Sequence, residues 1–425
     1  MRDHSKHIEL KREEAIEKLI EVSAFQPRTE TVDLHEALGR VTAGECPSKY
    51  DLPNALCAQM DGIAVHFDDF ADGIPDVTSW EYGKDYDWAN TGTAMPEGFD
   101  TSIAIERCEF TADGKLSKVN AAPDRRGANC KQPGDSFHKG DVIVGARERL
   151  TPTKISALAM CGYTDVEVIV KPRVVFIPTG DELVPMGQEL PHGKSYETNG
   201  ILLEQKMLLW GAEPVIYPCL PDDWDQIKAA IIKACGEADI VSINAGSSKG
   251  SKDFTMEILE EIGTVFCHET NHGPGHHTSA SVVDGTPVLG LSGPPGGCEI
   301  TADWYLKPLI DQYLYGAPVA FTTVTAQLTE PIAGHKPGGP AGRPDMLKGK
   351  KPAGGPGKDF FAIKPVTLEF TSDGIKATPV KGKGHLNLVQ LDTADGYLEM
   401  NPRKFGELKP GSTVQIELRY PYTAK

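Results

Sequence analysis

The sequence has no long hydrophobic run, and this absence removes two classes of protein. No stretch of about 18 or more uncharged apolar residues occurs among its 425 residues. The opening segment, MRDHSKHIELKREEA, is polar and does not resemble a secretory leader. We therefore expect neither a membrane span nor a signal peptide, and we expect a cytoplasmic protein.

Paired cysteines are missing as well. The 9 cysteines are dispersed, odd in number and never arranged as CxxC. This pattern argues against a disulfide framework and against a zinc ribbon, both of which need cysteines at short regular spacings. We expect reduced thiols.

Positive charge is scarce. With 60 acidic residues against 43 lysines and arginines, the formal net charge is −17, so nucleic acid and anionic membranes are poor partners. An anionic substrate must then be held locally. Backbone amides at helix starts and a few lysines can do this, and a divalent cation bound by carboxylates would neutralise a pyrophosphate.

Length and residue pattern predict a multidomain α/β plus β protein, because 425 residues exceed one ordinary core. Over residues 173–316, strands alternate with helices, which predicts a central three-layer α/β domain with a mostly parallel sheet. Short strands and turns over residues 51–139 predict a small β domain, inserted into a discontinuous N-terminal helical and extended domain of residues 1–50 and 140–172. Residues 317–425 predict a C-terminal β-barrel-like domain.

Helical spacing of apolar residues locates the main helices. A first amphipathic helix is expected within residues 10–25. The helices of the α/β domain are expected over residues 199–210, 224–235, 254–262 and 298–313.

The segment KPRVVFIPTGDEL, residues 171–183, predicts a buried parallel strand followed by a polar loop. Open α/β sheets bind ligands at the carboxyl ends of such strands. The loop supplies a hydroxyl, a flexible backbone and two carboxylates from Thr179, Gly180, Asp181 and Glu182. It is the first candidate site, and a merely capped turn is the alternative reading.

A second strand, residues 238–244, leads into the loop AGSSKGSKDF before a helix. Small residues there let backbone N–H groups face an anion, which is the arrangement of a phosphate cradle. Lys249 and Lys252 would add positive charge, and Asp253 would hold a metal; a flexible connection is the alternative. The loop residues assigned to substrate binding are Gly246, Ser247, Ser248, Lys249 and Gly250.

Two further turns lie between a predicted strand and a predicted helix. We expect Asp223 to cap the helix that follows it, whereas Asp222 is left open between a cap and a site residue. The turn GPPG, residues 293–296, begins with Gly293 and Pro294 and is either a structural bend or a backbone contact for an anion.

These motifs together resemble the molybdopterin molybdenumtransferase family of the MoeA and gephyrin E-domain type, as a divergent member. TGDEL, AGSSKGSKDF and LGLSGPPGG are similar to the family's TGDEL, GGxSxGxxD and GLPGNP in order and spacing. MDGIA at residues 60–64 and NTGTAMP at residues 90–96 are similar to its MDGYA and TGAxxP. The resemblance extends over residues 10–418.

The resemblance implies an activity and a set of site residues. It implies insertion of molybdate into adenylylated molybdopterin, with Mg²⁺-dependent release of AMP. Asp61, Glu182 and Asp253 would be catalytic, and Asp181 would join Glu182 and Asp253 as metal ligands. It also implies a homodimer, in which Asp61 and Thr91 on an extended arm of one subunit complete the site of the other, and it assigns Thr91 and Gly92 to substrate binding.

The sequence departs from the family most clearly at the histidine-rich turn, residues 271–277, which stands where the family has KPGKP. If His272, His276 and His277 replace those lysines as cations, ligand affinity should weaken as pH rises, because histidine titrates near about 6.5. A dedicated metal site of these histidines is disfavoured, because Gly and Pro interrupt any helical ligand face.

Loss of the lysines leaves an alternative function open. The chain would then be a non-catalytic paralogue that binds or carries molybdopterin, molybdate or tungstate. For either function, the expected protein partners are a molybdoenzyme or another cofactor-synthesis protein. The basic segment 334–358 is either a contact for an anionic ligand or a solvated linker.

Overall fold

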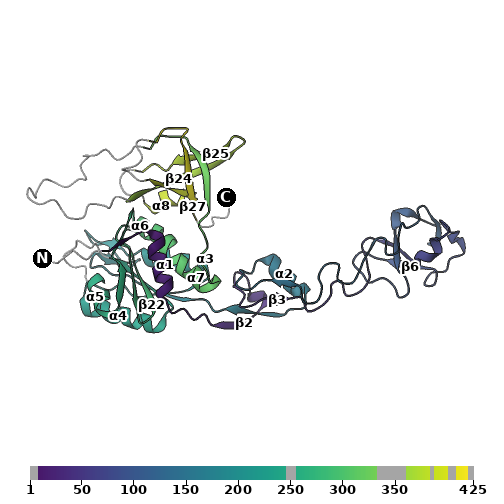
Figure 1. The fold of residues 1–425 in the computed structure, drawn as a ribbon, viewed down its shortest axis with the longest axis horizontal. Coiled ribbons are helices and arrows are strands. Elements are labelled where there is room, and N and C mark those ends of the chain that lie inside the picture. Colours follow the sequence, from purple (N-terminus) through teal and green to yellow (C-terminus); the bar gives the residue numbers. More distant parts are fainter. Residues whose placement is uncertain (1–7, 246–254, 333–359, 383–386, 401–407, 420–425) are drawn as a thin grey trace, which may run out of the picture. The chain divides into compact units, whose positions relative to one another are not determined.

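The computed structural model describes residues 8–245, 255–332, 360–382, 387–400 and 408–419. The chain divides into two units, one formed by Met1–Arg28 with Val170–Lys425 and the other by Thr29–Ile169 (Figure 1). All 9 cysteines lie in the described ranges and are free, as expected. Among these residues, every helix is too short or too polar to traverse a bilayer.

The first unit contains a six-stranded sheet with the order β16-β13-β17-β22-β21-β18. The strands β16, β13, β17 and β22 run parallel to one another, whereas β21 is antiparallel to β22 and β18 is antiparallel to β21. Their bounds are β13 Arg173–Ile177, β16 Glu213–Ile216, β17 Ile240–Ala245, β18 Thr264–Cys267, β21 Ser279–Val283 and β22 Thr286–Ser292. The predicted mostly parallel sheet is confirmed.

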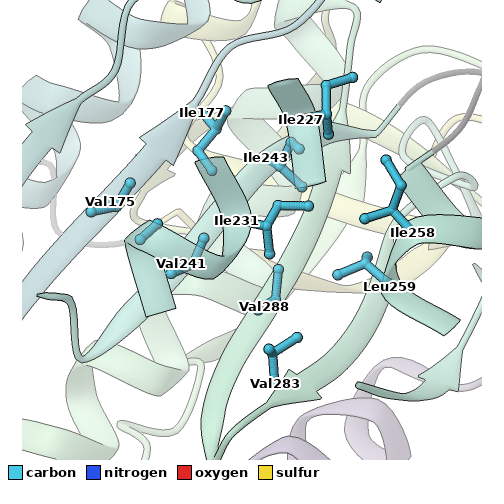
Figure 2. Packing of buried hydrophobic residues seen from close by; sticks show 11 residues of the cluster. Val175, Ile177, Ile227, Ile231, Val241, Ile243, Ile258, Leu259, Val283 and Val288 are labelled. Carbon is cyan, nitrogen blue, oxygen red and sulfur yellow. The ribbon is translucent and has the colours of Figure 1, made fainter. Parts of the chain in front are cut away.

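Helices cover both faces of this sheet. Successive residues of a strand point to opposite faces, and Val174, Val175, Phe176 and Ile177 of β13 are all fully buried. On one face, α4 (Trp224–Glu237) and α5 (Thr255–Ile262) pack their isoleucines onto the strands (Figure 2). On the other, α3 (Asn199–Trp210) contacts β13 and β16, and α6 (Pro295–Thr301) contacts β22. This is the predicted three-layer arrangement.

The helices of this unit have the following bounds: α1 Arg12–Val22, α3 Asn199–Trp210, α4 Trp224–Glu237, α5 Thr255–Ile262, α6 Pro295–Thr301 and α7 Lys307–Tyr315. A π-helical turn, Ala302–Leu306, joins α6 to α7. Helix α1 contacts α7 and β21. It therefore belongs to the unit that contains the α/β sheet, whereas the sequence pattern places it in the N-terminal domain.

The carboxyl-terminal part of the first unit is a closed five-stranded barrel. Strand β24 pairs with both β25 and β26, which closes the order β24-β25-β23-β27-β26, and β20 pairs with β24 from outside that ring. The bounds are β20 His272–Gly273, β23 Thr323–Leu328, β24 Phe361–Thr371, β25 Gly374–Pro379, β26 Gly396–Met400 and β27 Thr413–Leu418. Alternating burial fills the interior, since Val414 and Ile416 are buried while Thr413 and Gln415 are exposed. The predicted barrel is confirmed.

Short elements complete the first unit. They are β1 Glu9–Leu10, β14 Leu183–Val184, β15 Ser195–Tyr196, β19 Glu269–Thr270 and α8 Leu388–Asp392. Strand β1 pairs with β19, and β14, which begins at the last residue of the TGDEL motif, pairs with β15.

The second unit contains two main hydrophobic clusters. The first draws on residues 32–46 and 144–168, and its elements are β2 Thr29–Asp33, β3 Cys46–Pro47, β11 Val142–Val144, α2 Pro152–Met160 and β12 Asp165–Ile169. The second draws on residues 63–119, around β5 Gly62–Val65, β6 Tyr86–Ala89, β7 Thr101–Ala104, β8 Cys108–Phe110 and β9 Leu116–Val119. Strand β4 Cys57–Ala58 pairs with β10 Cys130–Lys131. We propose the inserted β domain, residues 51–139, on this basis.

Candidate substrate-binding site

The TGDEL loop, residues 179–183, follows β13 and is hydrogen-bonded to Leu220, which lies beyond the end of β16. Thr179 forms a bridge with Leu220, and the Gly180 N–H donates to the Leu220 carbonyl at 3.1 Å. Gly180 has a φ of +147°, and a Cβ there would lie 2.8 Å from Glu182 Oε1. Only glycine fits this position, and its absence of a side chain lets the Glu182 carboxylate fold back over the loop.

Asp181 and Asp222 lie together at the ends of the neighbouring parallel strands β13 and β16. The Asp222 N–H donates to Asp181 Oδ1 at 3.2 Å, and Lys194 Nζ donates to the Asp181 carbonyl at 2.6 Å. Asp223 Oδ1 accepts from the Gln226 N–H at 2.9 Å and caps α4. The expected cap is therefore confirmed, and Asp222 faces the TGDEL loop.

Several carboxylates surround Cys219 at the same edge of the sheet. Burial, reinforced by Glu197, Glu182 and Asp222, raises the pKa of the Cys219 thiol to about 11. The thiol therefore stays protonated at neutral pH and is a poor nucleophile. The gathered negative charge also means that an anionic pyrophosphate bound here would need a counter-charge.

The predicted metal ligands are only partly described. Within the described ranges, no three His, Cys, Asp or Glu side chains are grouped so as to hold a metal ion. Asp253 lies outside these ranges, as do Lys252 and the loop residues Gly246, Ser247, Ser248, Lys249 and Gly250. Asp181 and Glu182 do not form a complete Mg²⁺ site by themselves, and Mg²⁺ stays a prediction.

The GPPG turn, residues 293–296, joins the TGDEL loop through two asparagine side chains. Asn199 Nδ2 donates to the Gly293 carbonyl at 2.8 Å and to Asn244 Oδ1 at 3.1 Å. Asn244 Nδ2 in turn lies 3.5 Å from the Thr179 carbonyl. The ends of β13, β17 and β22 are thus connected by side-chain amides.

Sequence reasoning missed Asn199, Asn244, Glu197 and Cys219. The apolar pattern identifies Asn199 only as the start of a helix and Asn244 only as the end of a strand. One signal was available, because Asn244 is a polar residue at the carboxyl end of an otherwise apolar strand, where ligand-binding groups gather in parallel sheets.

The histidine-rich turn does not supply three cations. The His272 side chain is fully buried, its Nε2 lies 2.7 Å from the Tyr305 hydroxyl, and its ring stacks on Tyr305. Burial lowers the pKa of His272 to about 3, so it is neutral at physiological pH. The predicted imidazolium at this position is wrong, because aromatic packing against Trp304 and Phe361 excludes water.

His276 behaves differently, because both of its ring nitrogens face acceptors. Nδ1 contacts the Thr270 carbonyl, and Nε2 lies 3.3 Å from Glu269 Oε2. The hydrogen bond to Glu269 raises the pKa of His276 above its usual value. His277 Nδ1 lies 3.3 Å from the other Glu269 oxygen. The negative carboxylate of Glu269 therefore lies beside both histidines of this part of the turn.

Replacing His276 with Gln is expected to cost more stability at about pH 6 than at about pH 9. A raised folded pKa gives stability that is complete below the unfolded pKa, near about 6.5, and is lost as pH rises through the folded pKa. Urea unfolding of wild type and variant at both pH values measures this. His192→Gln, at an exposed position, is the control; an equal loss for His276→Gln at both pH values would contradict the raised pKa of His276.

Asp61 and Thr91 lie together in the second unit. The Thr91 N–H and Oγ1 donate to Asp61 Oδ1 at 2.8 and 2.9 Å. These hydrogen bonds lower the pKa of Asp61 and keep it ionised. Gly92 follows with a φ of +77°, and its N–H donates to the Ala58 carbonyl. These three predicted site residues therefore form one local motif.

Two family models match the chain. Residues 10–162 match the MoeA N-terminal region (domain I and II), and residues 175–312 match the probable molybdopterin binding domain. The chain belongs to the molybdopterin molybdenumtransferase family. Membership places it in molybdenum cofactor biosynthesis.

Relatives of this molybdopterin molybdenumtransferase family member support the same assignment. It is 29% identical over 312 residues to a molybdopterin molybdenumtransferase of Haemophilus influenzae, covering 70% of this chain and 76% of that protein. The enzyme of the same name from Bacillus subtilis is 29% identical over 307 residues, covering 68% and 71%. A crystal structure of a molybdopterin biosynthesis protein from Pyrococcus horikoshii superposes with a TM-score of 0.76 at 26% identity, covering 98% of this chain and 100% of that one.

Proposed function

We propose that this protein inserts molybdate into adenylylated molybdopterin and releases AMP. The observation that carries the proposal is the convergence of the TGDEL loop, Asp222 and the GPPG turn at one edge of a parallel sheet, in the domain that matches a molybdopterin-binding model. In the reaction, the oxygen of water bonds to one phosphorus of the pyrophosphate, and the bond from that phosphorus to the bridging oxygen breaks. The protons of the water pass to the two phosphate products and to solvent. In the insertion itself, the two dithiolene sulfurs bond to molybdenum and replace one oxygen of molybdate, which leaves as water with the two thiol protons, and molybdenum stays at oxidation state VI.

The residues have distinct proposed tasks. Backbone amides of the TGDEL loop and GPPG turn would orient the pyrophosphate, and Glu182 would act beside it as a catalytic carboxylate. A divalent cation, Mg²⁺, would offset the negative charge of Asp181 and Asp222, with Asp253 as a further ligand.

The deciding experiment is incubation of purified protein with adenylylated molybdopterin, molybdate and magnesium, with AMP measured over time. Release of AMP that depends on molybdate supports the enzyme. Binding of the adenylylated pterin without AMP release would overturn it and would favour the alternative, a carrier of molybdopterin or of a molybdate or tungstate oxyanion. Neutral His272 favours that alternative, because it leaves the replaced lysine turn with less positive charge.

We also propose a homodimer in which Asp61 and Thr91 of one subunit complete the site of the other. Cytoplasmic location and contact with a molybdoenzyme or another cofactor-synthesis protein belong to the same proposal. Twofold pairing is the commonest way in which identical subunits share a site.

A mixture of inactive Asp61→Asn and inactive Asp253→Asn subunits is expected to regain about one quarter of wild-type AMP release, since half of the dimers would be mixed and each would carry one intact site. The Asp61→Asn side chain keeps an oxygen that accepts from Thr91, so the arm should keep its local structure. Mass spectrometry of the mixture checks that mixed dimers form. Mixed dimers without activity would contradict the shared site.

A further inference from the structure

The side chain of Asn199 has a fixed orientation. Asn199 is the first residue of α3 and has a relative exposure of 4%. The Gly293 carbonyl, 2.8 Å away, can only accept a hydrogen bond, so the atom that faces it must be the amide nitrogen. The amide of Asn244 is oriented by the Thr179 carbonyl, which lies 3.5 Å from its Nδ2. The second hydrogen of Asn199 Nδ2 then points to Asn244 Oδ1.

The groups held in this way come from three adjacent strands. Thr179 follows β13, Asn244 is near the end of β17, and Gly293 follows β22, and these strands are neighbours in the sheet. Thr179 and Gly293 begin the two loops that carry described candidate substrate-binding residues. A single side chain, Asn199, therefore stands between both loops.

Packing alone does not explain an asparagine at this position. Asn199 Oδ1 is buried and accepts no hydrogen bond within the described part of the chain. A buried unpaired carbonyl destabilises the folded state, and an apolar residue of similar size would avoid that cost. What the amide supplies, and leucine would not, is two N–H donors aimed at two strand ends.

We propose that Asn199 is a positioning residue that sets the separation between the TGDEL loop and the GPPG turn, and so places the substrate pyrophosphate. This role rests on the proposed function. Asn199 acts through Gly293 and Asn244 and is not itself catalytic. A displacement of about 1 Å in a reacting group can cost roughly 100-fold in rate, so loss of the amide should lower kcat more than it raises KM.

Asn199→Asp tests this with almost no change in shape. The ionised carboxylate of this variant would aim oxygen at the Gly293 carbonyl and at Asn244 Oδ1, which repels both loops. The protonated carboxyl would donate to Gly293 and restore one of the two bonds, and burial beside acceptors should raise its pKa. We expect kcat to fall about 100-fold at about pH 8 and to recover at least about tenfold, relative to wild type, by about pH 6. Asn199→Leu should be equally slow at both pH values.

A matched control separates positioning from stability. Ser281 Oγ is buried in the same sheet and donates to the Val288 carbonyl at 3.0 Å, away from the carboxyl ends of the parallel strands. Ser281→Ala should lower stability without changing kcat or its pH profile. Thermal melts of all variants confirm that the assays are made on folded protein.

Hydrogen exchange gives a readout that needs no turnover. Asn199→Leu and Asn199→Asp, at about pH 8, should speed exchange in peptides that cover residues 178–184 and 289–298, whereas Ser281→Ala should not. The exchange measurement tests the positioning role even if the wild type releases no AMP. Absence of AMP release would contradict the proposed function but not the positioning role. Unchanged exchange in both peptides, or an Asn199→Asp pH profile parallel to wild type, would overturn the proposal.

Discussion

Glu182→Gln is expected to lower the rate of AMP release by roughly 100-fold or more, which is the usual loss when a catalytic carboxylate becomes neutral. The carboxylate lies over Gly180 at the carboxyl end of β13, beside Asp181 and Asp222. Glutamine keeps the size of the side chain and removes its charge. The fall should therefore reflect chemistry at the site and not a rearranged loop.

The stability of this variant should hardly change, because Glu182 is exposed and exposed substitutions usually stay within about 0.5 kcal/mol. Glu189→Gln is the matched control, since it removes an equally exposed carboxylate from the same connection. It should keep wild-type AMP release. A Glu182→Gln protein that turns over at the wild-type rate would remove Glu182 from the site.

Arg12→Ala is expected to lower the free energy of unfolding by about 3–5 kcal/mol, the range for a buried ion pair that loses one partner. Arg12 has a relative exposure of 8%, and its guanidinium contacts both Glu417 oxygens at 2.9 and 3.1 Å. It also lies 4.4 Å from the ring centroid of Trp304. The variant would leave the buried Glu417 carboxylate without this partner.

Urea unfolding measures the loss in the free energy of unfolding. Two further variants show whether this loss comes from the ion pair. Lys18→Ala, on the exposed face of α1, should change stability by no more than about 0.5 kcal/mol. Adding Glu417→Gln to Arg12→Ala should recover part of the stability, because the uncompensated charge is removed. A loss for Arg12→Ala as small as that for Lys18→Ala would show that the pair contributes little.

Elements set by local pattern were predicted closely from the sequence. The helix predicted over residues 199–210 is observed as Asn199–Trp210. The one predicted over residues 224–235 is observed as Trp224–Glu237 and is slightly longer than predicted. Gly211, with a φ of +87°, ends the first of these. The helix predicted over residues 298–313 begins earlier, at Pro295, and contains a π-helical turn. Nothing in the apolar spacing distinguishes that turn from an α-helix.

The candidate site was predictable where its residues follow a strand directly. The TGDEL loop, the GPPG turn and the Asp223 cap each depend on a few consecutive residues, whose strand end or helix start is visible in the sequence. Asn199 was not predictable as a site residue, because its partners Gly293 and Asn244 are 94 and 45 positions away.

The sequence by itself determined the alternation of strands and helices, the barrel strands and the strand-end motifs, because apolar periodicity and turn residues act over a few positions. Only the tertiary structure decided in which direction the pKa of each histidine is shifted and which polar side chains are hydrogen-bonded to one another. His272 is neutral because Trp304, Tyr305 and Phe361 enclose it, whereas the pKa of His276 is raised because its side chain hydrogen-bonds to Glu269. Burial and pairing depend on residues brought together by folding, and no local pattern records them.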